Sequence, residues 1–163
     1  MGTRYFLLIA TLVAIFTGYS HSARIQFLTP ILPYSINQNY TTEYIFEVYI
    51  PSPISNEAYL EIQFPFPLKT HPACAVYIKT PEDSYTKYPC DYVHSGLLIH
   101  IGKIVPGRYE FFIENVSNPS SDDIGNFYIR TYINRTTLID ESEGYQSTNF
   151  LQSPCKNFLN AFH

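Results

Sequence analysis

Four side chains that can bind metals or form covalent bonds lie close together in the middle of the chain. His71 and Cys74 are separated by two residues, and Cys90 and His94 by three. Two thiolates and two imidazoles could hold zinc in a tetrahedral site. In an oxidising compartment Cys74 and Cys90 would instead form a disulfide, closing a loop of about 16 residues and stabilising the fold by about 3 kcal/mol. We predict the disulfide, with zinc as the alternative, because prolines stiffen both segments and secretory thiols normally oxidise first.

The third cysteine, Cys155, is left over once this pair has formed. An odd cysteine in a secreted protein predicts either an intermolecular disulfide or a free thiol. A buried thiol would behave as an ordinary small hydrophobic side chain. Both alternatives remain open for Cys155.

A short segment contains the residue types of a hydrolase triad, namely Asp91, His94 and Ser95. Triad members come from separate elements so that their side chains can converge, and these three are too close in sequence for that. The Gly-x-Ser-x-Gly pattern that places a nucleophile on a sharp turn is also missing from the sequence. We therefore predict no enzymatic activity and no cofactor.

Acidic residues in two later segments form a weaker pattern. Asp122 and Asp123 lie in one, and Asp140, Glu141 and Glu143 in the other. If the two segments met at one end of the fold, their oxygens could bind calcium. The spacing matches no EF-hand loop, so calcium is an alternative to an ordinary solvated surface.

The elements that must position these residues are short runs in which apolar and polar side chains alternate. Alternation with a period of two places one face of a strand toward a core and the other toward water. The sequence therefore predicts an all-β protein, an antiparallel immunoglobulin-like β-sandwich of about 7–9 strands, with an eight-strand jelly roll as the alternative topology. The expected strands cover residues 24–28, 42–50, 59–64, 73–79, 88–93, 96–102, 108–114 and 126–133, with a last edge segment at 136–140.

Residues 105–134 are the segment around which we expect the sandwich to be organised. Two alternating runs flank the polar, breaker-rich residues 117–125, which predicts an antiparallel hairpin between them. Pro106, Gly107 and Tyr109 have the arrangement of a tyrosine corner, in which the hydroxyl bonds the backbone and the ring packs inward.

Several bulky side chains fall on the outward positions of these runs. The alternation places Ile45 and Tyr49 on one solvent face, and Phe112, Tyr128 and Tyr132 on another. Aromatic patches of this kind favour protein contacts or carbohydrate stacking, unless neighbouring strands and glycans cover them.

The sequence predicts that the chain is divided into three parts. Arg4, an apolar run and small residues are typical of a cleavable signal peptide at 1–22, with a run too short to span a bilayer. The β-sandwich domain then covers 23–144. In the tail, 145–163, Ser153 and Pro154 predict the start of a short helix that packs on a sheet edge or docks a second subunit. We expect a secreted protein with no membrane span after signal cleavage.

Charge and sequons are consistent with an extracellular protein. The formal net charge of −4 gives no electrostatic attraction to nucleic acid. Asn39, Asn115 and Asn134 each begin an Asn-x-Ser/Thr sequon, whereas Asn118 is excluded because Pro119 follows it. N-linked glycans are therefore expected at three sites.

The pattern Gly107-x-Tyr-x-Phe-x-Ile-x-Asn-Val-x-Asn-Pro-Ser120, then Gly125-x-Phe-x-Ile-x-Thr-Tyr132 and Ile139-Asp-Glu-Ser142, resembles β-sandwich units of secreted and surface proteins of ciliates. In those proteins the units often lie in large extracellular chains, sometimes beside cysteine-rich repeats. The present sequence contains no cysteine-rich array, and we expect no membrane anchor. The resemblance implies the immunoglobulin-like fold and an extracellular location, and it implies no catalytic residues.

Together these patterns favour a structural or interaction subunit of an extracellular surface assembly or filament. Its partners would be other extracellular proteins or copies of itself. The alternative is a soluble extracellular ligand- or carbohydrate-binding module, with or without calcium.

Overall fold

The computed structural model describes residues 24–33, 41–68, 74–82, 84–118 and 125–146. Several predicted features lie outside these residues, namely the signal peptide 1–22, the tail helix starting near Ser153, and the site residues Asn39, His71, Asp122, Asp123 and Cys155.

The described part of the chain is all-β, and its named strands pair antiparallel. None of the described residues forms a helix long and apolar enough to cross a membrane. The strands are β1 (Gln26–Phe27), β2 (Leu32–Pro33), β3 (Thr41–Ile50), β4 (Ile54–Gln63), β5 (Ala75–Lys79), β6 (Thr86–Val93), β7 (Gly96–Ile104), β8 (Gly107–Ser117), β9 (Asn126–Ile133), β10 (Thr137–Glu141) and β11 (Tyr145–Gln146).

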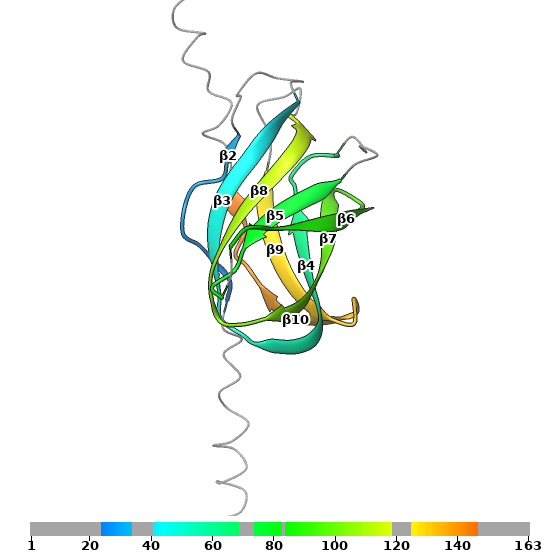
Figure 1. The fold of residues 1–163 in the computed structure, drawn as a ribbon. Coiled ribbons are helices and arrows are strands. Elements are labelled where there is room, and N and C mark those ends of the chain that lie inside the picture. The colour runs from blue at the N-terminus through cyan, green and yellow to red at the C-terminus, as the bar shows by residue number, and fades with distance from the viewer. Residues whose placement is uncertain (1–23, 34–40, 69–73, 83, 119–124, 147–163) are drawn as a thin grey trace, which may run out of the picture.

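These strands form one curled sheet in the order β1-β3-β8-β5-β6-β7-β4-β9-β10, with β2 added to β3 and β11 to β9 (Figure 1). Strand β6 pairs with β5 on one side and with β7 on the other. It therefore joins two parts, which we name the first half-sheet (β3, β8 and β5) and the second half-sheet (β7, β4, β9 and β10).

Aromatic rings pack between the two half-sheets. The Tyr44 ring of β3 lies 5.6 Å from the ring of Phe64, which directly follows β4, and 6.2 Å from the ring of Phe127 in β9. Phe46 stacks on Phe111 within the first half-sheet at 5.1 Å. The core therefore lies between the inner faces of the two half-sheets.

The two ends of the curled sheet also meet. Ile25 forms an isolated bridge with Ser142, and the Phe27 ring lies 5.2 Å from the ring of Tyr145. Arg24 and Glu143 form an exposed ion pair beside this bridge. The segment before β1 thus connects the edge of the first half-sheet to the edge of the second.

The alternation in the sequence predicted the inward side chains well. All but one of the expected core positions in these runs are buried, because a pleated strand can place only every second side chain in the core. The exception is Ile133, the last residue of β9, which is half-buried where the strand reaches its turn. The buried positions are Tyr44, Phe46, Val48, Ile50, Leu60, Ile62, Phe64, Leu97, Ile99, Ile101, Tyr109, Phe111, Ile113, Phe127, Ile129 and Thr131.

The predicted hairpin within 105–134 is wrong. Strand β8 pairs with β3 and β5, whereas β9 pairs with β4, β10 and β11, so the two strands lie in different half-sheets. The connection between them crosses from one half-sheet to the other. A polar segment of this length does not impose pairing on its flanking strands, as a two-residue turn would.

Several strand boundaries also differ from the prediction. Strand β4 begins at Ile54 rather than at residue 59, and its pairing with β7 is irregular between Ile54 and Ala58, where Glu57 has a φ of 50°. This bulge hides the alternation in the sequence. The sheet also continues beyond the predicted domain end at 144, since β11 pairs with β9.

Tyr109 makes the backbone contact expected of it. Its ring is buried, and its hydroxyl donates to the carbonyl of Val105 at 2.9 Å and accepts from the amide of Val105 at 3.1 Å. The backbone at Gly107 has a φ of 153°, and a Cβ there would approach Cγ of Pro81 at 2.5 Å. The turn before β8 therefore requires glycine at position 107.

We expect Tyr109→Phe to lower the free energy of unfolding by about 1–3 kcal/mol, because two backbone groups of Val105 lose their partner. Equilibrium urea unfolding measures this difference. Tyr49→Phe is the matched control, because Tyr49 lies on the outer face and is 40% exposed. A Tyr109→Phe protein as stable as the control would contradict this role.

Candidate functional site

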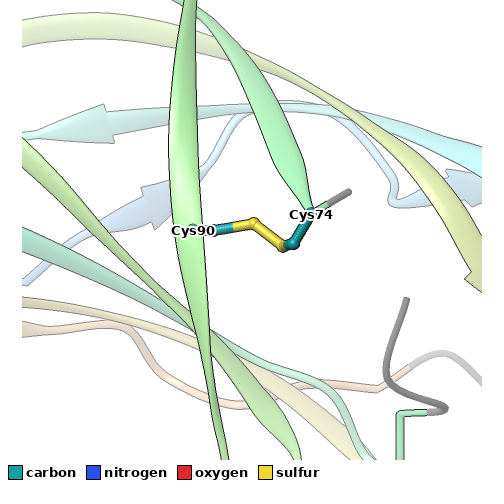
Figure 2. Close-up of a disulfide and its surroundings, with 2 residues drawn as sticks. All are labelled: Cys74 and Cys90. Atoms are coloured by element: carbon teal, nitrogen blue, oxygen red, sulfur yellow. A yellow bond between two sulfur atoms is a disulfide. The ribbon is translucent and has the colours of Figure 1, made fainter. Parts of the chain in front are cut away.

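The predicted disulfide is present. Cys74 directly precedes β5, and the pairing of Ala75 with Pro89 places Cys74 opposite Cys90 of β6. The two sulfur atoms are bonded, with a Cα–Cα distance of 5.5 Å (Figure 2). The thiolates that the zinc alternative requires are therefore not free to bind a metal. Across the described residues, no group of three or more histidine, cysteine, aspartate or glutamate side chains is arranged to hold a metal ion.

The described carboxylates of the calcium alternative have separate protein partners. Asp140 is buried and accepts hydrogen bonds from the amide of Ser52 at 3.2 Å and from its hydroxyl at 2.9 Å. Glu141 pairs with Arg130, and Glu143 with Arg24. These three residues diverge to three partners rather than converge on one point.

The hydrogen bonds of Asp91 and Ser95 go to residues outside the triad alternative. The Asp91 carboxylate accepts from Arg135 at 2.5 Å, and the Ser95 carbonyl accepts from the amide of Phe64 at 3.0 Å. His94 occupies the turn between β6 and β7 with a φ of 52°.

The outward aromatic residues are grouped differently from the prediction. In the first half-sheet Phe112 lies between Ile45 of β3 and Tyr77 of β5. Tyr128 and Tyr132 belong to β9 and therefore to the second half-sheet. The predicted grouping of Phe112 with these two tyrosines is wrong, because it depended on the hairpin between β8 and β9.

We name one outward cluster the aromatic patch, defined as Ile45, Tyr77, Tyr85 and Phe112. Together with Glu110 these residues line a shallow pocket of about 220 Å³. The Tyr77 and Phe112 rings meet edge to face at 5.8 Å, and Ile45 and Tyr85 are 40% and 47% exposed. The sequence alternation indicated Ile45 and Phe112, but Tyr85 lies outside any strand and was missed.

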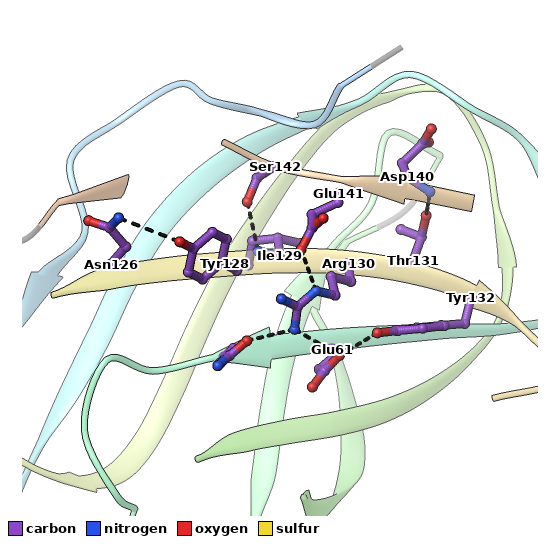
Figure 3. Close-up of polar contacts among 11 residues, drawn as sticks. Glu61, Asn126, Tyr128, Ile129, Arg130, Thr131, Tyr132, Asp140, Glu141 and Ser142 are labelled. Atoms are coloured by element: carbon purple, nitrogen blue, oxygen red, sulfur yellow. Dashed lines mark hydrogen bonds and ion pairs between the residues drawn. The ribbon is translucent and has the colours of Figure 1, made fainter. Parts of the chain in front are cut away.

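The second outward cluster is the tyrosine–arginine face, which consists of Tyr59 in β4, Tyr128, Arg130 and Tyr132 in β9, and Arg135 in the following turn. The Arg130 guanidinium lies at its centre. It donates to Glu141 at 2.6 Å and to Gln63 at 2.6 Å, and it contacts Glu61 at 3.5 Å (Figure 3). The Tyr132 hydroxyl donates to Glu61 at 2.6 Å.

Ring contacts hold the remaining side chains of this face. Tyr59 stacks on His100 of β7 with ring centroids 4.6 Å apart, and the guanidinium of Arg135 lies 5.2 Å from the Tyr59 centroid. Arg130 lies 5.4 Å from the centroid of Tyr128. Each tyrosine and each arginine of the face therefore already has at least one partner within the protein.

The electrostatics of the face keep Tyr132 protonated and Arg130 charged. Burial, and then the hydrogen bond to Glu61, raise the pKa of Tyr132 from 10.0 to about 12. Burial lowers the pKa of Arg130, but Glu141 and Glu61 outweigh it, so this pKa is raised. The chemistry available on this face is recognition by hydrogen bonding, charge and ring stacking.

Two of the predicted glycosylation sites lie within the described residues. Asn115 in β8 and Asn134 in the turn after β9 are both exposed, with φ values of 61° and 53°. Asn118, the residue that Pro119 excludes from the sequons, is buried and accepts a hydrogen bond from the Tyr44 hydroxyl at 2.7 Å. Of these three asparagines, the two whose sequons are intact are exposed, and the one followed by proline is buried.

Comparison with known proteins adds no family to this description. No family model matches the chain, and no curated protein matches it.

We expect replacement of Cys74 and Cys90 by serine to lower the free energy of unfolding by about 3 kcal/mol, the chain-entropy value for a loop of this size. Urea unfolding of the double variant, compared with the oxidised and the reduced wild type, tests this. Reduced wild type should resemble the variant. If reduction leaves the unfolding midpoint unchanged, the bond does not stabilise the hairpin of β5 and β6.

We expect Tyr132→Phe to lower the free energy of unfolding by about 1 kcal/mol at neutral pH, because Glu61 loses a donor. The pKa of the Tyr132 phenol is higher in the folded protein than in the unfolded chain. The contribution of this phenol to stability is therefore complete below about pH 10 and is lost as the pH rises through about 12. The variant should therefore lose less stability than wild type over this alkaline interval, as measured by urea unfolding at several pH values. Equal alkaline losses would contradict the assignment, with Tyr128→Phe as the control.

Proposed function

We propose that this chain is a secreted, N-glycosylated, immunoglobulin-like β-sandwich that acts as a structural or interaction subunit of an extracellular surface assembly or filament. The observation that carries this proposal is the tyrosine–arginine face, in which the aromatic and guanidinium groups are already ordered. Its partners would be copies of the chain itself or other extracellular proteins.

The composition of this face supports a protein contact. Tyrosine and arginine are enriched in protein interfaces and among the residues that dominate binding energy. Arg130 and Arg135 keep 24% and 53% of their side-chain surfaces accessible. Because neighbours already hold these side chains, binding a partner costs little additional side-chain entropy.

The strand order supports an immunoglobulin-like sandwich. In such folds three central strands pair as C, F and G, an added C′ strand pairs with C, and strand E lies beside B. Here β7, β4, β9 and β10 are neighbours in the order C′, C, F and G, and β3 and β8 pair as B and E do. The present chain departs from the pattern in β6, which joins the two half-sheets, and in its disulfide, which lies within one hairpin.

Secretion is supported by the disulfide and by the accessible sequons. Disulfides persist in oxidising compartments, and Asn115 and Asn134 are exposed. The signal-like segment at 1–22 and the resemblance to ciliate extracellular units support the same location.

A second candidate function, a soluble carbohydrate-binding module, is favoured by the aromatic patch. Its pocket offers exposed rings beside the Glu110 carboxylate, a combination suited to the apolar faces and hydroxyl groups of a sugar.

The deciding experiment is sedimentation velocity of the purified secreted protein at micromolar concentration, together with intact mass before and after reduction and deglycosylation. We expect self-association that Tyr59→Ser weakens about tenfold or more, as for a residue of an interface centre. Tyr77→Ser on the aromatic patch is the matched control and should associate like wild type.

A protein that stays monomeric at every concentration would contradict a self-assembling subunit. Weakening by Tyr77→Ser rather than Tyr59→Ser would contradict the choice of face. A covalent dimer that reduction separates would identify Cys155 as the intermolecular link, since Cys74 and Cys90 bond each other.

A further inference from the structure

Asn115 lies at a β-bulge on the outer face of β8. The alternation of buried and exposed side chains is interrupted there: Ile113 and Val116 are buried, and the two residues between them are not. The pairing with β3 shifts register at the same place, between Thr42 and Tyr44. The extra residue brings Asn115 to the same outer face as Phe112.

The backbone at Asn115 suits an asparagine. Its φ of 61° is in the left-handed region, which asparagine tolerates better than most residues. The side chain is exposed, and Ser117 completes the sequon on the same strand. Asn134 is also exposed but follows β9, which belongs to the second half-sheet.

The aromatic patch begins three residues before Asn115 on the same strand. At about 3.3 Å per residue, Phe112 and Asn115 are separated by about 10 Å or less along β8. An asparagine side chain and its first sugars span a comparable length. Phe112 lies between Ile45 and Tyr77, so a sugar chain that returns along β8 meets the patch.

The chemistry of the patch matches a pyranose ring. Such a ring has apolar C–H faces and a rim of hydroxyl groups. The patch provides exposed apolar and aromatic surface, and Glu110 and Lys79 provide a polar rim, with the Lys79 amine 5.9 Å from the Tyr85 centroid. A sugar would therefore cover apolar surface and keep its hydroxyl groups bonded.

We propose that an N-linked glycan on Asn115 folds back over the aromatic patch, with its first N-acetylhexosamine packed against Phe112. This inference rests on the proposed secretion and glycosylation of the chain. It assigns the patch to the chain's own sugar and leaves the tyrosine–arginine face as the surface for a protein partner.

Attachment follows the ordinary transfer chemistry of the secretory pathway. The amide nitrogen of Asn115 attacks C1 of the first sugar of a lipid-diphosphate-linked oligosaccharide. The N–C1 bond forms, the C1–O bond to the diphosphate breaks, the lipid diphosphate leaves, and a base of the transferase takes the amide proton. No change of oxidation state is involved.

The test uses the full chain secreted from a glycosylating host, in three forms. One keeps its glycans, one is trimmed enzymatically to the first sugar, and one is stripped by a peptide N-glycosidase. The readouts are the rate of Tyr85 nitration, followed by peptide mass, and the thermal unfolding midpoint. Because stripping is done on the folded protein, failure to fold does not obscure the result.

We expect the trimmed form to resemble the intact one, because the first sugar makes the contact. The stripped form should nitrate at Tyr85 several-fold faster and lose about 4 °C in the midpoint. Stripping the Asn134→Gln protein should still produce both changes, whereas the same treatment of the Asn115→Gln protein should produce neither. Phe112→Ala should also remove the midpoint shift.

Three results would overturn the proposal: an unmodified Asn115 in the secreted protein, a stripped form that matches the intact one in both readouts, or changes that persist in Asn115→Gln. Because stripping converts Asn115 to aspartate, an Asn115→Asp protein provides the reference for the added charge. These readouts do not depend on assembly. A monomer whose Tyr85 is protected by sugar would overturn the proposed assembly alone, and a self-associating protein with an unprotected Tyr85 would overturn the glycan contact alone.

Discussion

Burial of aromatic and aliphatic side chains between the two half-sheets is the interaction on which the rest of the structure depends. Tyr44, Phe64 and Phe127 meet across the core, and Phe46 stacks on Phe111 beside them. Fully burying a side chain such as phenylalanine contributes about 1.5–3 kcal/mol, so a cluster of this size opposes much of the entropy lost on folding. Strand β6 maintains the curl by pairing with both half-sheets.

The pleat of the strands then determines what the protein presents to solvent. Because Leu60 and Ile62 are buried, the residues beside them in β4 point outward, and the same holds around Ile129 in β9. Two strands that are adjacent in space but distant in sequence thus place Glu61 next to Arg130 and Tyr132. The order of the tyrosine–arginine face is a consequence of the core packing behind it.

The two outer faces differ in a way that bears on function. The tyrosine–arginine face satisfies its charges internally, since Arg130 has two carboxylate neighbours and one amide neighbour. The aromatic patch has exposed rings and a bulge beside it that carries an intact sequon. The tyrosine–arginine face can therefore bind a partner without rearrangement, whereas an uncovered aromatic patch favours aggregation.

The sequence by itself determined the all-β class, the inward positions of most strands, the Cys74–Cys90 pair and the backbone contact of Tyr109. These features depend on local pattern, because a period of two fixes which side chains share a face and a short cysteine spacing brings two thiols together. Strand pairing was decided by the tertiary structure. The sequence around β8 and β9 carries no signal for their separation, so the predicted hairpin was wrong, and with it the grouping of Phe112 with Tyr128. The Arg130 network and the aromatic patch depend on contacts between residues distant in the chain, which hydrophobic packing of the whole sheet brings together.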